Sequence, residues 1–134
     1  MKLNPSKAIA LGTLLYAVLF TISYVSGQGS QYDGFYQESW LEATSGLLAW
    51  FLPGLVAGSV TRKSPVRVGL FLGLIVVAFD FGATALVFGL DWAVAALNVF
   101  PGTEIFIILS EVVFVYAGWK IQQINSQGTK PNVA

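Results

Sequence analysis

The stretch VGLFLGLIVVAFDFGATALVFGL, residues 68–90, decides the fold, because it is long, apolar and interrupted by only one charged residue, Asp80. A helix rises about 1.5 Å per residue and the hydrocarbon core of a bilayer is about 30 Å thick, so roughly 20 apolar residues are enough to cross it. The stretch therefore predicts a transmembrane helix with one acid near its middle.

Three further segments have the same apolar character, at residues 8–25, 43–60 and 103–119. The second of them contains Pro53, which a membrane helix tolerates when its neighbours satisfy the freed carbonyl group. With residues 68–90 they make four predicted spans. The sequence thus predicts an all-α fold, an integral membrane four-helix bundle that forms a single domain over residues 1–134.

The segments between the spans are short and differ in character. Residues 27–42 are predicted to form a polar, aromatic loop with a turn at Asp33-Gly34, and residues 61–67 a tight basic connection. Residues 91–102 are too short to cross the membrane, so we expect them to lie in its interface. Residues 121–134 form a polar tail that we expect to fray.

The charges are distributed unevenly along this pattern. All seven basic residues fall at the amino terminus, in the second loop or in the tail, which a four-span topology places on one side: Lys2, Lys7, Arg62, Lys63, Arg67, Lys120 and Lys130. Five acids fall on the opposite side: Asp33, Glu38, Glu42, Asp91 and Glu104. Because Lys and Arg favour the cytoplasmic face, both termini are predicted to be cytoplasmic, and we expect a bacterial or archaeal cytoplasmic membrane.

The first apolar segment has one alternative interpretation, a cleaved signal peptide. Lys2 and Lys7 precede it, and Ser26-Gly27 offers small residues for cleavage. The run is longer than a usual signal core, and its removal would leave three spans with the new amino terminus outside. We therefore interpret it as a retained span.

The composition excludes several classes of function. The chain has 134 residues, no cysteine, no histidine, 10% charged residues and a formal net charge of zero. Without Cys or His it cannot build a Ser-His-Asp or Cys-His catalytic arrangement, and it lacks the commonest metal and haem ligands. We expect no enzymatic activity, no cofactor, no metal site and no nucleic-acid partner, and we expect the lipid bilayer and either a homo-oligomer or a larger membrane complex as partners.

Two pairs of glycines mark the expected helix contacts. Gly54 and Gly58 lie one helical turn apart in the second span, and Gly69 and Gly73 repeat this spacing in the third. Small residues at this spacing let membrane helices approach closely. We predict that the pairs close the hairpin formed by these two spans, with a homodimer contact as the alternative.

Two acids lie within predicted spans. Asp80 precedes Leu90 by ten residues, which places it about 15 Å from the outer end of its helix. Glu111 follows Thr103 by eight residues in a helix of opposite direction, about 12 Å below the same surface. The two acids are therefore predicted to share one level, and to face the bundle interior or a watery cavity.

The surroundings of these acids suggest an ion or proton site. No Lys, Arg or His lies within any span, so if Asp80 and Glu111 meet we expect at least one of them to be protonated near neutral pH. Glu104 stands two turns above Glu111 on the same helix face, and Tyr16 of the first span offers a hydroxyl donor. The alternative is that both acids are structural, either holding helices together or pairing with a basic residue of a partner subunit.

The leading functional hypothesis is a small transporter or channel for protons or cations, with Asp80, Glu111, Glu104 and Tyr16 as candidate binding residues. The rival is a non-catalytic accessory or assembly subunit of a larger membrane complex. It is suggested by the absence of a reactive motif and by the aromatic loop residues Tyr32, Phe35, Tyr36 and Trp40. Lipid or quinone binding between helices is a third possibility.

Overall fold

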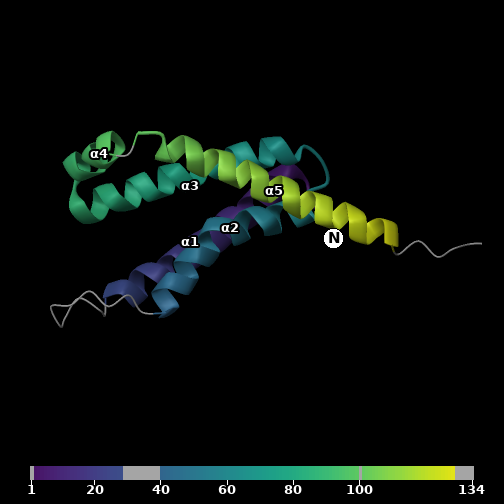
Figure 1. Cartoon of the computed structure of the whole chain (residues 1–134), viewed down its shortest axis with the longest axis horizontal. Helices are drawn as coiled ribbons and strands as arrows, with labels where there is room; N and C mark the ends of the chain where they lie inside the picture. Colours follow the sequence, from purple (N-terminus) through teal and green to yellow (C-terminus); the bar gives the residue numbers. More distant parts are fainter. Residues whose placement is uncertain (1, 29–39, 100, 129–134) are drawn as a thin grey trace, which may run out of the picture.

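The fold consists of five helices, and the computed structural model describes residues 2–28, 40–99 and 101–128 (Figure 1). The helices are α1 (Pro5–Gln28), α2 (Trp40–Val60), α3 (Pro65–Phe88), α4 (Leu90–Val99) and α5 (Thr103–Gly128). Within these ranges there is no β-strand, only an isolated bridge between Leu3 and Thr61. The all-helical class predicted from the sequence is therefore confirmed.

The helices α1, α2 and α3 are each long and apolar enough to cross a membrane. A fourth span is present if α4 and α5, which are bent by 78° relative to one another, count as one broken span. Such a set of helices indicates an integral membrane protein. The aromatic loop residues Tyr32, Phe35 and Tyr36, the turn at Asp33-Gly34, and the charged residues Glu38 and Lys130 lie outside the described residues.

The helix ends follow local chemistry rather than the limits of the apolar runs. Pro65 occupies the first turn of α3, where its missing N–H has no helical partner to lose. Gly89 and Gly102, each with a φ of 96°, separate α4 from its two neighbours. The tail after Lys120, which was expected to fray, is helical as far as Gly128, and no glycine or proline lies between these two residues.

One end of the molecule is closed by backbone contacts between the amino terminus and the α2–α3 connection. The N–H of Leu3 donates to the Val60 carbonyl at 2.6 Å, and the N–H of Arg62 donates to the Leu3 carbonyl at 2.9 Å. The exposed side chains of Lys2, Lys7, Arg62, Lys63 and Arg67 lie at this end, which we call the basic end. The opposite end, where α4 lies, is called the acidic end.

The helix α5 packs against both α2 and α3, and the glycines make this possible. A Cβ atom on Gly58 would overlap the carbonyl group of Val115 in α5. A Cβ on Gly69 would lie 2.5 Å from the Cα of Val112, and one on Gly73 would lie 2.7 Å from the Cα of Ile108. The two glycine pairs therefore face α5, and not each other's helix as the sequence had suggested.

The core is tightest toward the basic end. Five side chains there are completely buried against one another: Ala8, Ala57, Val68, Leu72 and Val115. A second cluster of Tyr16, Ala49 and Val76 lies farther toward the acidic end. Figure 1 shows the α1–α2 hairpin and the α3–α5 pair diverging in that direction, so the helices are packed closely in one half and spread in the other.

The size of the side chains on α1 explains the divergence. Near the basic end a Cβ on Gly12 would lie 3.0 Å from Leu72, so α1 and α3 are in close contact there. Farther along, the ring of Phe79 lies 5.6 Å from that of Tyr16 and 5.3 Å from that of Phe20, centroid to centroid. Aromatic rings between α1 and α3 hold these helices farther apart than glycine does.

The glycine contacts predict a strong positional effect on stability. We expect Gly58→Ala to lower the free energy of unfolding by about 1–3 kcal/mol, because the α5 backbone must move to accept the methyl group. Equilibrium unfolding in mixed detergent micelles measures this change. Gly82→Ala is the matched control, since a Cβ there meets nothing within 4 Å. Equal effects of the two substitutions would contradict the proposed role of close backbone approach.

Candidate functional site

The four candidate binding residues, Tyr16, Asp80, Glu104 and Glu111, line two cavities in the half of the molecule nearer the acidic end. The first, which we call the acidic groove, has a volume of about 550 Å³ and is lined by residues of α3, α4 and α5, among them Asp80, Phe81, Thr84, Leu97, Thr103 and Glu104. The second, which we call the aromatic cavity, has a volume of about 290 Å³ and is lined by Tyr16, Phe20, Ala49, Trp50, Asp80 and Glu111, among others. Both volumes exceed what a single water molecule needs.

Asp80 lies at the boundary between the two cavities. Its side chain lines both of them, as does that of Ile107, so these two residues form a shared wall. Asp80 is exposed, and of the two surroundings predicted for it, the bundle interior or a watery cavity, it has the second. This exposure follows from the divergence of the helices, because the face of α3 that is buried at Gly73 and Val76 is no longer covered at Asp80.

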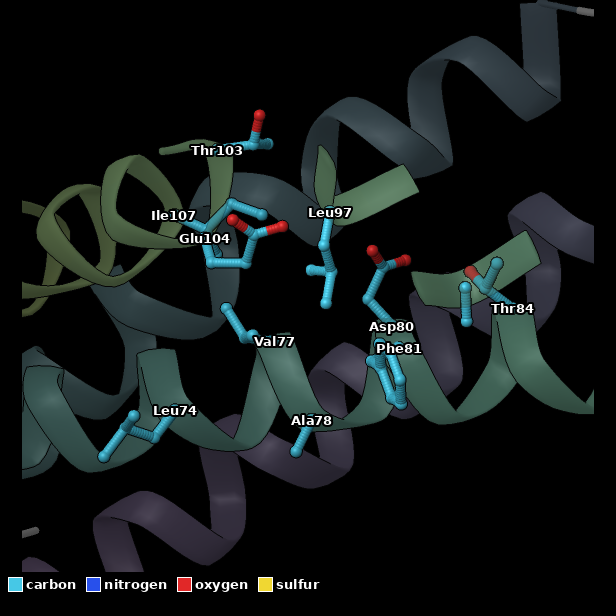
Figure 2. A pocket seen from close by; sticks show the side chains of 11 residues that line it. Leu74, Val77, Ala78, Asp80, Phe81, Thr84, Leu97, Thr103, Glu104 and Ile107 are labelled. Atoms are coloured by element: carbon cyan, nitrogen blue, oxygen red, sulfur yellow. The ribbon is translucent and has the colours of Figure 1, made fainter. Parts of the chain in front are cut away.

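Glu104 faces Asp80 across the acidic groove. Figure 2 shows both carboxylates turned toward the same hollow, with the Leu97 side chain of α4 between them. Glu104 lies in the first turn of α5, where the helix dipole favours a negative charge. The remaining lining is mostly apolar, so the two acids are the charged groups of this groove.

Glu111 is the most deeply placed acid of the described residues. It is completely buried, and neither of its carboxyl oxygens has a hydrogen-bond partner within the part of the chain that the structure describes. Its Oε2 atom would lie 2.5 Å from a Cβ on Gly54, so the carboxyl group occupies the space that this glycine leaves in α2. An unsatisfied buried acid is expensive and is commonly retained for a function.

A second polar group at this point comes from the backbone of α2. Pro53 is buried in α2 and has no N–H, so the carbonyl oxygen of Ala49 loses its usual helical donor. Ala49 lines the aromatic cavity together with Glu111. The proline therefore adds a backbone acceptor to the region in which the buried carboxyl group lies.

Sequence reasoning singled out four of the lining residues and missed others. Tyr16, Asp80 and Glu111 line the aromatic cavity, while Glu104 joins Asp80 in the acidic groove. Trp50 was not predicted as a site residue. It lies within a span, whereas Trp40 and Trp92 lie near span ends, and this unusual position could have marked it as a candidate. The Trp50 indole N–H donates to the Ser110 hydroxyl at 3.3 Å, which fixes the ring beside the cavity.

Comparison with known proteins assigns no family to the chain. No family model matches the chain, and no curated protein and no solved structure matches it. The candidate site is therefore argued from its own residues.

The burial of Glu111 predicts a gain in stability when the acid is removed. We expect Glu111→Met to raise the free energy of unfolding by about 1–3 kcal/mol, because an unpaired buried polar group costs about that amount. Detergent-micelle unfolding curves measure the gain. The same change at Glu104, which is partly exposed, serves as control and is expected to shift stability by less than about 0.5 kcal/mol. A marked loss of stability in Glu111→Met would show that the carboxyl group has a stabilising partner.

Proposed function

We propose that the chain is a small membrane transporter that moves protons or cations through a pathway of carboxylates, from Glu104 to Asp80 to Glu111. The observation that carries the proposal is the shared wall, where Asp80 lines both the groove of Glu104 and the cavity of Glu111. Acids in such positions are costly in a membrane and commonly mark ion or proton pathways. The pathway begins near the acidic end and leads toward the middle of the bundle.

The packing supports a carrier rather than an open channel. Beyond Glu111, toward the basic end, Val68, Leu72 and Val115 are completely buried against one another. The acidic groove and the aromatic cavity lie in the other half, where the helices diverge. A bound ion would therefore leave on the other side only after the α1–α2 hairpin and the α3–α5 pair had changed their relative positions, which is the principle of alternating access.

We propose that the basic end faces the cytoplasm. The exposed residues Lys2, Lys7, Arg62, Lys63 and Arg67 lie at this end, and Lys and Arg concentrate in cytoplasmic segments. The helix α5 runs toward the same end, because it starts beside α4 and antiparallel to α3 (Figure 1). The described parts of both terminal regions would then be cytoplasmic, and the acidic groove would open to the outside.

The orientation predicts a simple labelling pattern. The natural chain has no cysteine, so single cysteines can be introduced without background. In sealed, right-side-out vesicles we expect a membrane-impermeant maleimide to label Asp91→Cys and to leave Lys2→Cys and Lys63→Cys unlabelled until the vesicles are opened. Labelling of Lys2→Cys and Lys63→Cys from opposite sides would contradict the fold, and labelling of both from outside would reverse the orientation.

The transport proposal predicts that flux depends on Asp80 and Glu111, two of the three acids of the pathway. In proteoliposomes with an imposed gradient, we expect Asp80→Asn and Glu111→Gln each to reduce proton or cation flux about tenfold or more, equivalent to about 1.4 kcal/mol on the barrier. A pH-sensitive dye inside the liposomes measures proton flux, and ion-selective dyes measure sodium and potassium.

The matched control for this experiment is Asp91→Asn. It removes one carboxylate from the acidic end, but Asp91 is absent from the lining of both cavities. We expect its flux to equal that of the unmodified chain. Equal flux in all variants would disprove the role of the acids, and the complete absence of flux would favour the accessory-subunit hypothesis.

A further inference from the structure

The aromatic cavity combines two features that a simple proton pathway does not require. Glu111 and Asp80 line it, and so do the aromatic side chains of Tyr16, Phe20 and Trp50. Its volume of about 290 Å³ is much larger than a proton or a single dehydrated metal ion needs. The cavity therefore has room for an organic molecule.

The aromatic side chains are held in place by their neighbours. The rings of Tyr16 and Phe20 both make edge-to-face contacts with Phe79, at centroid distances of 5.6 and 5.3 Å. On the α2 side, the ring of Trp50 makes an edge-to-face contact with that of Phe114 at 5.9 Å. Rings fixed before binding lose little conformational entropy when a ligand arrives.

The buried carboxyl group of Glu111 has no counter-charge among the residues that the structure describes. Both oxygens of Glu111 are without a hydrogen-bond partner in residues 2–28, 40–99 and 101–128. Among these residues the basic side chains are Lys2, Lys7, Arg62, Lys63, Arg67 and Lys120, which lie at the basic end or beyond it. These residues therefore place no positive charge beside Glu111, and a bound cation would supply one.

The lining indicates which kind of cation fits. Hard metal ions need several oxygen ligands, and no group of three acidic side chains suited to a metal occurs among the described residues. Aromatic rings instead attract alkylated ammonium groups, whose charge is spread over apolar carbon. Carboxylates beside such rings add the opposite charge in a site that is otherwise apolar.

We propose that the aromatic cavity binds an organic ammonium cation, with its charged group near Glu111 and Asp80 and its carbon substituents against Tyr16, Phe20 and Trp50. This inference rests on the proposed transport function and names its cargo class. The 550 Å³ acidic groove, which shares the wall at Asp80 and Ile107, lies on the approach from the acidic end. Both acids then serve one ligand, Asp80 at entry and Glu111 at the bound position.

The test uses a pair of molecules with the same shape and different charge. Benzyltrimethylammonium is the cation, and neopentylbenzene is its neutral carbon analogue. Equilibrium dialysis with the purified full chain in detergent measures binding, and circular dichroism checks that each variant is folded. We expect saturable binding of the cation and none of the neutral analogue at the same concentration.

The variants separate the contribution of charge from that of the aromatic wall. We expect Glu111→Gln to weaken binding about tenfold or more. Trp50→Leu is expected to weaken it about fivefold, with Trp50→Phe in between, because a ring of smaller electron density attracts a cation less strongly. Asp91→Asn and Trp92→Leu are the controls, since neither residue lines the acidic groove or the aromatic cavity, and the affinity of these variants is expected to be unchanged.

Three results would overturn the inference: no saturable binding of the cation, equal binding of the neutral analogue, or unchanged affinity in folded Glu111→Gln. The ammonium group that the cavity binds in a membrane could belong to a free cation or to the headgroup of a lipid such as phosphatidylcholine. Repeating the measurement in nanodiscs of phosphatidylcholine and of phosphatidylglycerol distinguishes the two sources. Equal affinity in both assigns the site to a free cation, whereas loss of binding only in phosphatidylcholine assigns it to a lipid headgroup and overturns the cargo proposal.

Binding without a membrane gradient is independent of flux, so the two proposals fail separately. Acid-dependent proton flux without binding of benzyltrimethylammonium would leave the transport proposal intact and remove the cargo class. Binding that depends on Glu111, together with the absence of any flux, would support the site and remove transport.

Discussion

The close approach of the α5 backbone to α2 and α3 is the constraint on which the rest of the structure depends. Inside lipid there is no hydrophobic force that drives helices together, so packing and short backbone distances must hold them. Gly58 on α2 and Gly69 and Gly73 on α3 lack the side chains that would keep α5 away, and Gly118 of α5 likewise lies against Leu55. These contacts fix both the position and the rotation of α5.

The rotation of α5 in turn determines the chemistry of the site. With Val112 and Val115 held against the glycine faces, Glu111 is directed into the space beside Gly54 and becomes completely buried. In the half nearer the acidic end, rings replace glycine on α1, the helices separate, and Asp80 lies at the surface of two cavities. The closely packed half nearer the basic end thus holds the helices together, and the half in which the helices diverge contains the candidate site.

Hydropathy predicted the helices well because the requirement to cross the hydrocarbon layer acts on each segment by itself. The predicted spans at residues 8–25, 43–60 and 68–90 correspond to α1, α2 and α3, whereas a fourth span is present only if α4 and α5 count as one broken span. Hydropathy marks the edge of an apolar region, however, and not the end of a helix. This is why α5 continues past Lys120 to Gly128 without a breaking residue.

The candidate site was predicted only in part, because its geometry depends on the partner of each helix face. A pair of small residues one turn apart indicates that another helix packs closely there, but the spacing of Gly69 and Gly73 does not identify that helix. The exposure of Asp80 depends on aromatic contacts between α1 and α3, which periodicity within one helix does not reveal. The acids could be identified from the sequence, because they are charged residues within predicted spans. Their surroundings depend on the tertiary packing of the helices, which the sequence pattern did not give.

The bridge between Leu3 and Thr61 bears on the order in which the protein is assembled during synthesis. It joins a residue shortly before the start of α1 to the residue just after the end of α2, so this hairpin can be fastened while the ribosome is still making α3. The helix α5 emerges after the four others, and until it inserts, the glycine faces of α2 and α3 are covered only by lipid. The insertion of α5 therefore covers these faces and, in the same step, brings Glu111 beside Gly54 of α2.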